Sequence, residues 1–267
     1  MPETTFTKLY GPSPVQDLYD RWKQQGIAQT RKAFLTEFST LPALNHWLQS
    51  LELTGLDFEL LLEGFTHGSF AHENTDWPSN ERLEFLGDAC LQMITSLELF
   101  YLYPEAPEGI LSKRRGTLVN REVLAALALE MELAPFLLLG RGEVALGGRG
   151  KATVLADALE AFLSVIYLSR GLEACQNFFL KLTQVSSLRY WGEERFETFD
   201  FKSHLQEKIL GLYKELPEYQ SREIDQGFEV ELRVKGKLLA KLVGPSKKQL
   251  MKDCAEKVLK EETYLDL

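Results

Sequence analysis

Apolar residues recur three or four positions apart through most of the chain before residue 186, and this spacing gives a helix one apolar face. No segment in this region alternates apolar and polar positions as a half-buried strand does. The clearest helical segments are 88–103, 120–133 and 153–169. We therefore predict an all-α domain over residues 46–185.

The pattern differs on either side of this domain. Residues 1–45 form an N-terminal extension with helical segments at 15–25 and 31–38, and the sequence assigns it no role. Residues 186–199 are aromatic and charged rather than rich in glycine and serine, which favours a linker that packs over one that swings freely.

Residues 200–267 are predicted to form a small second domain with the order α-β-β-β-α. Its second strand alternates apolar and polar residues, and Ser246 is a good N-cap for its last helix. The predicted elements are a helix at 201–213, strands at 218–225, 227–236 and 237–243, and a helix at 246–262. The fold class is thus mainly α, with a small α/β domain at the C-terminal end.

The composition is that of an ordinary soluble globular protein, with 45% hydrophobic and 26% charged residues. No stretch approaches the ~20 apolar residues of a membrane span, and the first residues lack the pattern of a secretory signal. Cys90, Cys175 and Cys254 are far apart and odd in number, which favours a reducing compartment. We therefore expect a cytoplasmic protein with no membrane partner.

The net charge of −9 argues on its face against a nucleic-acid partner. The charge is unevenly spread, however, because residues 232–252 contain seven basic residues and no acidic one. A local basic stripe, rather than the total charge, is what matters for binding phosphates. The seven residues are Arg233, Lys235, Lys237, Lys241, Lys247, Lys248 and Lys252.

Acidic residues interrupt two of the apolar helical segments. Glu81, Glu84 and Asp88 are spaced so that a helix places them on one face. Asp157 and Glu160, three positions apart, share a face of a second helix. Like charges placed this way repel one another, so a positive group is expected between them. Lys or Arg could serve, but a hard divalent cation such as Mg²⁺ suits oxygen ligands better. Each acid taken singly is also compatible with a solvated surface charge.

NERLEFLGD at 80–88 closely resembles the signature of the ribonuclease III family. Three more segments resemble that family in the right order: FTHGSF at 65–70, EGILSKRRGTLVNREVLAALA at 108–128 and GRGEVALGGRGKATVLADALEAFLSVIYL at 140–168. The C-terminal segments DFKSHLQE, GFEVELRV and GPSKKQLMKDCAEKVL resemble a double-stranded-RNA-binding domain. The resemblance covers about residues 46–262, and several ordered motifs are far more specific than one.

The resemblance implies a homodimeric, Mg²⁺-dependent endoribonuclease that hydrolyses double-stranded RNA to 5′-phosphate and 3′-hydroxyl ends. Mn²⁺ is the expected substitute metal, and no small-molecule cofactor is implied. Ribosomal RNA precursors and messenger RNAs are the expected substrates. By motif position the metal ligands are Glu84, Asp88, Asp157 and Glu160, of which Asp88 and Glu160 are also assigned to catalysis.

Three further residues of the first domain receive roles from the resemblance. Glu81 and Glu108 match two acids near the scissile phosphate, and Phe85 matches an aromatic residue that inserts into the partner subunit. A core phenylalanine is an equal alternative for Phe85. Gly68 and Leu146 replace the arginine and serine common in the family, so altered contacts with RNA are expected.

The C-terminal domain carries the residues that the resemblance assigns to RNA binding. The loop before residue 227 lacks the usual histidine, and Leu250 and Asp253 stand where small alanines are common. A folded module with weak affinity for RNA is therefore the alternative. The assigned residues are Gln206 and Glu207 on the first helix and Ser246, Lys247 and Lys248 at the start of the last.

Two other interpretations compete with the enzyme. One is a non-catalytic double-stranded-RNA-binding or ribosome-associated protein, and the other is an α-helical interaction domain with a small appendage. The complete set of acids favours the enzyme. The sequence does not determine the physiological RNA targets, the role of the extension, the affinity of the C-terminal module or the orientation of the two domains.

Overall fold

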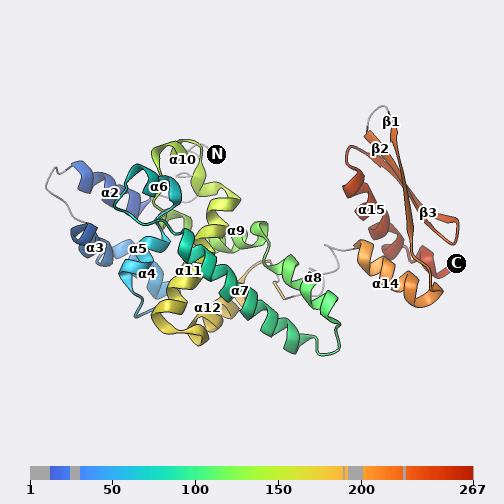
Figure 1. The fold of residues 1–267 in the computed structure, drawn as a ribbon, viewed down its shortest axis with the longest axis horizontal. Coiled ribbons are helices and arrows are strands. Elements are labelled where there is room, and N and C mark those ends of the chain that lie inside the picture. The colour runs from blue at the N-terminus through green and yellow to red at the C-terminus, as the bar shows by residue number, and fades with distance from the viewer. Residues whose placement is uncertain (1–12, 25–30, 189, 192–200, 225–226, 267) are drawn as a thin grey trace. The chain divides into compact units, whose positions relative to one another are not determined.

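The computed structural model describes residues 13–24, 31–188, 190–191, 201–224 and 227–266. The chain divides into two compact units, Met1–Tyr190 and Trp191–Leu267 (Figure 1). The first unit is all-α, as the apolar spacing predicts, and the second contains the three-stranded sheet.

The first unit is built around one long apolar helix, α11. Most of its residues are buried because α5, α7, α9 and α12 pack against it (Figure 1). Its central residues are therefore close-packed on several sides, as in the interior of a helical domain. The helices of the unit are α2 (Pro14–Gln24), α3 (Arg31–Ser39), α4 (Pro42–Ser50), α5 (Phe58–Gly64), α6 (Gly68–Glu73), α7 (Glu81–Leu102), α8 (Glu108–Leu118), α9 (Arg121–Glu130), η1 (Ala134–Phe136), α10 (Arg141–Ala145), η2 (Gly148–Gly150), α11 (Ala152–Arg170) and α12 (Leu172–Val185).

Helices α7 and α11 approach most closely at Gly87. A Cβ atom at this position would lie 1.8 Å from the backbone oxygen of Glu160, so only glycine fits. Four residues earlier on α7, the carbonyl of Leu83 accepts a hydrogen bond from Ser164 Oγ at 2.5 Å. A glycine inside a helix costs about 1 kcal/mol relative to alanine. Here that cost permits backbone contact between two helices that both carry acids.

The N-terminal extension contributes two helices to this unit, at the positions that its apolar spacing predicts. Tyr19 and Trp22 of α2 and Phe34 of α3 join Phe70 and Trp77 in a cluster of edge-to-face aromatic rings. All five side chains are buried. Burial of large aromatic side chains is a dominant source of packing energy, so α2 and α3 are part of the folded unit.

The beginning of the predicted linker also packs against the first unit. Tyr190 is buried, and its hydroxyl donates a hydrogen bond to the carbonyl of Leu118 at 3.0 Å. The hydroxyls of Ser186 and Ser187 both donate to the carboxylate of Glu130. Positions 192–199 of this linker lie outside the described residues.

Helices α7 and α11 are also long and apolar enough to cross a membrane by length and composition. This differs from the expectation of no such stretch, because an 18-residue window of each helix stays apolar on average although it can contain up to two charged residues. The window of α11 is mostly buried within the unit, and core helices pass the same test. The window of α7 is one-third buried, and Met93 and Phe100 are exposed on this helix.

The second unit has the predicted order α-β-β-β-α. Its antiparallel sheet has the strand order β1-β2-β3, and Val230, Leu232 and Val234 of β2 are buried in one core with residues of both long helices. The observed bounds fall within two residues of the predicted ones. They are α14 (Phe201–Tyr213), β1 (Glu218–Ile224), β2 (Gly227–Val234), β3 (Lys237–Gly244), α15 (Lys247–Lys260) and η3 (Thr263–Asp266).

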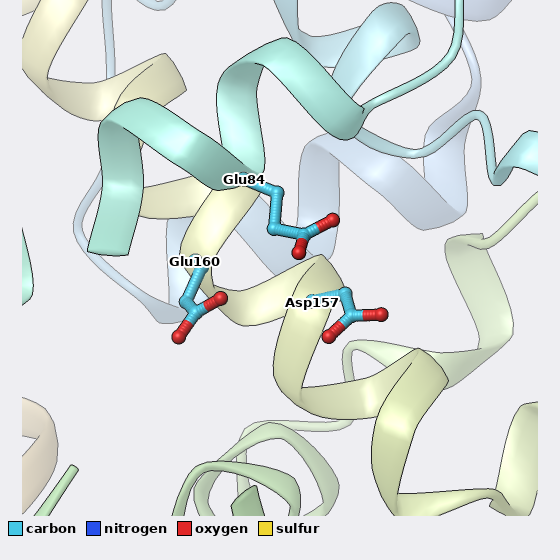
Figure 2. A group of neighbouring side chains, drawn as sticks. All are labelled: Glu84, Asp157 and Glu160. Carbon is cyan, nitrogen blue, oxygen red and sulfur yellow. The ribbon is translucent and has the colours of Figure 1, made fainter. Parts of the chain in front are cut away.

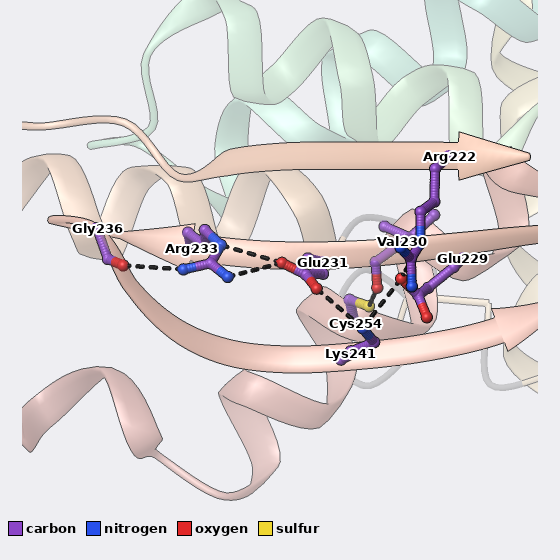
Figure 3. A network of polar contacts seen from close by, with 8 residues as sticks. All are labelled: Arg222, Glu229, Val230, Glu231, Arg233, Gly236, Lys241 and Cys254. Atoms are coloured by element: carbon purple, nitrogen blue, oxygen red, sulfur yellow. Dashed lines mark hydrogen bonds and ion pairs between the residues drawn. The ribbon is translucent and has the colours of Figure 1, made fainter.

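The alternate residues of β2 carry charge rather than apolar side chains (Figure 3). Glu229 pairs with Arg222 of β1 and with Lys241 of β3, at 2.5 and 3.0 Å. Glu231 pairs with the same Lys241 at 3.0 Å and with Arg233 at 2.7 Å. Hydrogen bonds from these cations lower the pKa of both glutamates. Two of the seven residues in the predicted basic stripe are therefore paired with glutamates of β2, Lys241 from the neighbouring strand and Arg233 from within β2 itself.

We expect Gly87→Ala to destabilise the first unit by about 3 kcal/mol or more, because the new methyl group overlaps the α11 backbone and the helices must separate. Gly116→Ala is the matched control, since Gly116 is an exposed helical glycine whose Cβ would meet nothing within 4 Å. Alanine there should stabilise by up to about 1 kcal/mol. Calorimetric unfolding of both variants tests this, and equal effects of the two substitutions would contradict it.

Candidate metal centre

Three carboxylates from two helices meet where α7 crosses α11. Oxygen atoms of Glu84, Asp157 and Glu160 lie within 4.8 Å of one another (Figure 2). Glu84 projects from the first turn of α7, and the other two project from one face of α11. All three side chains are partly exposed, so the cluster is open to solvent. The structure thus brings together three of the four acids that were predicted to bind metal.

This donor set fits a hard divalent cation. Three carboxylates within one small space supply only oxygen, and carboxylate oxygen is the ligand type that suits Mg²⁺ and Mn²⁺. The partial exposure leaves room for the water ligands that Mg²⁺ retains.

Asp88, the fourth predicted ligand, lies one turn after Glu84 on α7 but outside the three-membered cluster. Its Oδ1 accepts a hydrogen bond from Gln92 Nε2 at 3.2 Å. Its charge nevertheless helps to raise the pKa of both Glu84 and Glu160. Asp88 is therefore within electrostatic reach of the cluster, although it does not join it in this structure.

The two auxiliary acids differ in position. Glu81 is exposed at the start of α7, and its charge contributes to the raised pKa of Glu84. Its Oε1 would lie 3.2 Å from a Cβ atom at Gly68, so the glycine leaves the carboxylate space. Glu108 is exposed at the start of α8, where it accepts a hydrogen bond from Ser112 Oγ at 2.6 Å. Among the described residues, Glu108 is not part of the acidic cluster.

Burial and crowding raise the pKa of Glu160 to about 8. Desolvation is the largest cause, and the neighbouring charges of Asp88, Asp157 and Glu84 add to it. Burial also raises the pKa values of Glu84 and Asp157, although the backbone and nearby cations oppose the shift at Asp157. The site holds negative charge at a cost in free energy, which a bound divalent cation would offset.

The structure identifies two residues near the acids that sequence analysis did not assign. The guanidinium of Arg121, in the first turn of α9, lowers the pKa values of Asp157 and Glu160 and so partly balances the cluster. His67 is the N-cap of α6, and its Nδ1 accepts from the Ser69 backbone N–H at 3.2 Å. Burial lowers the pKa of this imidazole. Both lie in quoted motifs, NREV and FTHGSF, but motif matching alone did not give them a role.

Comparisons with known proteins agree with this geometry. A family model described as Ribonuclease-III-like matches residues 57–185, which contain every clustered acid. "Ribonuclease 3" of Pseudothermotoga lettingae is 37% identical over 216 residues, covering 76% of this chain and 89% of the relative. "Ribonuclease 3" of Borreliella afzelii is 38% identical over 247 residues, covering 90% and 96%. The chain belongs to the ribonuclease III family.

A solved structure supports the same assignment. The nuclease domain of ribonuclease III from Campylobacter jejuni is 38% identical, with a TM-score of 0.50, and covers 53% of this chain and 96% of that one. The protein is thus a ribonuclease III-type endonuclease.

Phe85 lies on the surface of this ribonuclease III-family protein, with 80% of its area exposed. The alternative of a core phenylalanine is therefore wrong. The sequence could not decide this, because Leu83 two positions earlier is equally apolar and is buried. Helical geometry places the two side chains in different directions, and only packing against α11 shows which one faces inward.

The predicted RNA-binding residues of the second unit lie at two helix positions. Ser246 is the N-cap of α15, and its Oγ accepts a hydrogen bond from the Gln249 backbone N–H at 3.4 Å. Lys247 and Lys248 follow it and are exposed. Gln206 is exposed on α14, whereas the side chain of Glu207 lies outside the described residues. Leu250, which departs from the family pattern, is buried in the core of the unit, so its role here is packing.

The raised pKa of Glu160 predicts that the metal-free protein becomes less stable as pH rises from about 5 to about 8. Over this range the unfolded chain has released the proton that the folded carboxyl retains, so unfolding is favoured by higher pH. Glu160→Gln should remove the part of this dependence that Glu160 contributes, and the smaller part that comes from the raised pKa values of Glu84 and Asp157 should remain. We expect the variant to be more stable than the parent at pH 8 in EDTA by about 1 kcal/mol, less than the full shift implies because solvent screens the group.

Thermal unfolding in EDTA at several pH values measures this effect. Glu105→Gln is the matched control, because Glu105 is exposed in a turn distant in sequence from the three clustered acids. A Glu160→Gln variant less stable than the parent at pH 8 would contradict the prediction.

Proposed function

We propose that this protein is a Mg²⁺-dependent endoribonuclease that hydrolyses double-stranded RNA and leaves 5′-phosphate and 3′-hydroxyl ends. The observation that carries the proposal is the convergence of Glu84, Asp157 and Glu160 within 4.8 Å at a close crossing of two helices. Repulsion among these carboxylates lowers the stability of the fold. A function in binding a cation together with an anionic substrate explains why they are held together. Mn²⁺, with similar ligand preferences, is the proposed substitute.

The proposed division of labour follows the two units. Residues 46–185 would form the catalytic domain and residues 200–267 the double-stranded-RNA-binding domain. Glu84, Asp157 and Glu160 would hold the metal, with Asp88 beside them. The metal, when bound, would orient a water molecule and offset charge that develops on the phosphate. Arg121 would limit the repulsion among the acids before metal and substrate arrive.

A homodimer is part of the proposal. Phe85, Met93 and Phe100 are 80%, 54% and 62% exposed on α7, and large exposed apolar side chains on one helix suit a protein interface. The Campylobacter jejuni structure concerns a region involved in dimer formation of that nuclease domain. Two copies would supply two acidic clusters, one for each strand of a duplex. Phe85 is the proposed contact with the partner.

The second unit would hold the duplex without reading its sequence. Lys247 and Lys248 are exposed at the amino end of α15, where the helix dipole also favours anions. Gln206 and Glu207 on α14 are the proposed contacts to the minor groove, since double-stranded RNA is recognised mainly by shape. Processing of ribosomal and messenger RNA precursors in the cytoplasm is the proposed setting.

Cleavage of a long RNA duplex tests the proposed function. We expect the purified protein to cut the duplex with Mg²⁺ but not with EDTA, and to leave single-stranded RNA and DNA duplexes intact. Glu160→Gln should lower the cleavage rate by at least about 100-fold. Loss of a residue that only supports a metal ligand lowers activity by up to about 100-fold, and loss of a direct ligand should cost at least as much.

Duplex binding by the same variant provides the control. Retained binding with lost cleavage is expected, because the substitution changes one acid and leaves the second unit intact. If the parent protein binds the duplex but never cuts it, with Mg²⁺ or Mn²⁺, the protein is a non-catalytic RNA-binding member of the family.

We also expect Lys247→Ala with Lys248→Ala to weaken duplex binding by about tenfold, equally for all sequences, and to reduce the slope of affinity against salt by about two. The matched control is Lys241→Ala, which removes a lysine already paired with Glu229 and Glu231. Binding isotherms at several salt concentrations measure both effects. A larger loss in the control than in the double variant would contradict the assignment.

A further inference from the structure

A segment that we call the rim loop, residues 137–151, connects α9 with α11 and lies beside the acidic cluster. Two observations place it there. The charges of Glu143 and Lys151 in the loop influence the pKa of His67. The charges of Asp157 and Glu81 influence the pKa of the same imidazole, so the loop and these acids both lie near His67. The loop ends at Lys151, whose carbonyl accepts the first hydrogen bond of α11, from the backbone N–H of Leu155 at 3.1 Å.

The rim loop is braced from within. The ammonium group of Lys151 pairs with the carboxylate of Glu143 at 2.6 Å. Gly147 has a φ of 70°, a left-handed conformation that favours glycine, and a Cβ atom at Gly148 would lie 2.5 Å from Glu143 Cγ. These contacts make the rim loop compact, and we expect its residues to move together.

Helix α6 holds one side of the rim loop. Ser69 Oγ accepts from the backbone N–H of Gly140 at 3.0 Å, and Glu73 Oε1 accepts from that of Arg141 at 2.8 Å. These contacts fix the start of α10 and come from the FTHGSF motif and the residues after it.

Helix α2 of the N-terminal extension holds the other side. The side-chain oxygen of Gln16 accepts two hydrogen bonds, from the backbone N–H of Leu139 at 3.3 Å and from Arg149 Nη2 at 3.2 Å. Arg149 is buried, and its Nη2 also donates to the carbonyl of Leu137 at 3.0 Å. The side-chain oxygen of Gln16 thus contacts the rim loop both near its start, at Leu139, and near its end, at Arg149. The family model begins at residue 57, so α2 lies outside it.

Because a buried guanidinium must be satisfied by acceptors, loss of the Gln16 oxygen leaves a charged donor without one of its partners. Movement of Arg149 toward water would relieve this loss. Such a movement would shift the neighbouring residues, including Lys151 and the exposed cation Arg141, relative to the acids. Positive groups at the edge of an acidic site matter because the acids themselves repel RNA phosphates.

We propose that α2 is a positioning element for the substrate, in which Gln16 holds Arg149 and Leu139 and so sets the rim loop for contact with duplex phosphates. The proposal rests on the proposed function for the identity of the substrate. Gln16 is a positioning residue, because it acts through the loop and not on the reacting atoms.

The test exploits the fact that both hydrogen bonds to Gln16 use an acceptor oxygen. Gln16→Met keeps the length of the side chain and removes the acceptor, whereas Gln16→Glu keeps an acceptor facing a guanidinium. Gln24→Met is the matched control, because Gln24 lies on the same helix and is exposed. All variants are made in the full chain.

Three measurements are made on each variant. Hydrogen exchange of peptides covering residues 137–151 reports the loop directly, with neither metal nor RNA present. Steady-state cleavage of an RNA duplex, together with Mn²⁺ binding measured by electron paramagnetic resonance, separates substrate binding from the metal site.

We expect Gln16→Met to speed exchange in the rim loop and to raise KM for the duplex by roughly fivefold, the scale of one lost hydrogen bond. The kcat value and Mn²⁺ affinity should stay within about twofold of the parent. Gln16→Glu and Gln24→Met should match the parent in all respects. A variant that merely lost packing would instead lower kcat through a smaller folded fraction.

Unchanged exchange in Gln16→Met would overturn the proposal, because Gln16 would then not hold the loop. Faster exchange with an unchanged KM would overturn its functional half. Equal defects in the Met and Glu variants would assign Gln16 to packing rather than hydrogen bonding and would also overturn it. Failure of the parent protein to cleave duplex would count against the proposed function, while the exchange result would still decide whether Gln16 holds the loop.

Discussion

Backbone contact between α7 and α11 at Gly87 is the constraint on which the site depends. Without a side chain at this position, the α7 glycine can lie against the carbonyl of Glu160, and the two helices cross closely enough for their acids to meet. The hydrogen bond from Ser164 to Leu83 supports the same crossing one turn earlier. Tight packing around α11 then keeps the geometry fixed, because interiors at this density do not yield to local repulsion.

That packing supplies the free energy needed to hold like charges together. Burial and mutual repulsion raise the pKa of Glu160 to about 8. The surrounding residues thus make negative charge in the metal-free site unfavourable. A scaffold that stays folded around such a cluster is preorganised for a cation, since the cost of assembling the ligands has been met before binding. Arg121 moderates the repulsion without occupying the cluster.

The second unit keeps its charged and apolar residues on opposite faces of its sheet. Its sheet places paired charges on one face, where Lys241 bridges Glu229 and Glu231, and apolar residues on the other (Figure 3). Exposed lysines are left at the start of α15, at a helix terminus that favours anions. Counting basic residues along the sequence therefore overstates the cationic surface, because cross-strand pairing is invisible until the register of the strands is known.

Periodicity and motif order alone determined the mainly α fold class, the order of elements in the second unit and the acids of two helices, because helical spacing and strand alternation are local properties of a sequence. Tertiary structure decided what depends on contacts between distant segments. It placed Phe85 on the surface and left Asp88 outside the closest cluster. It also showed that Gly87 sets the helix crossing, and that the extension reaches residue 149 through Gln16. Such contacts join residues far apart in the chain, and no pattern within one segment records them.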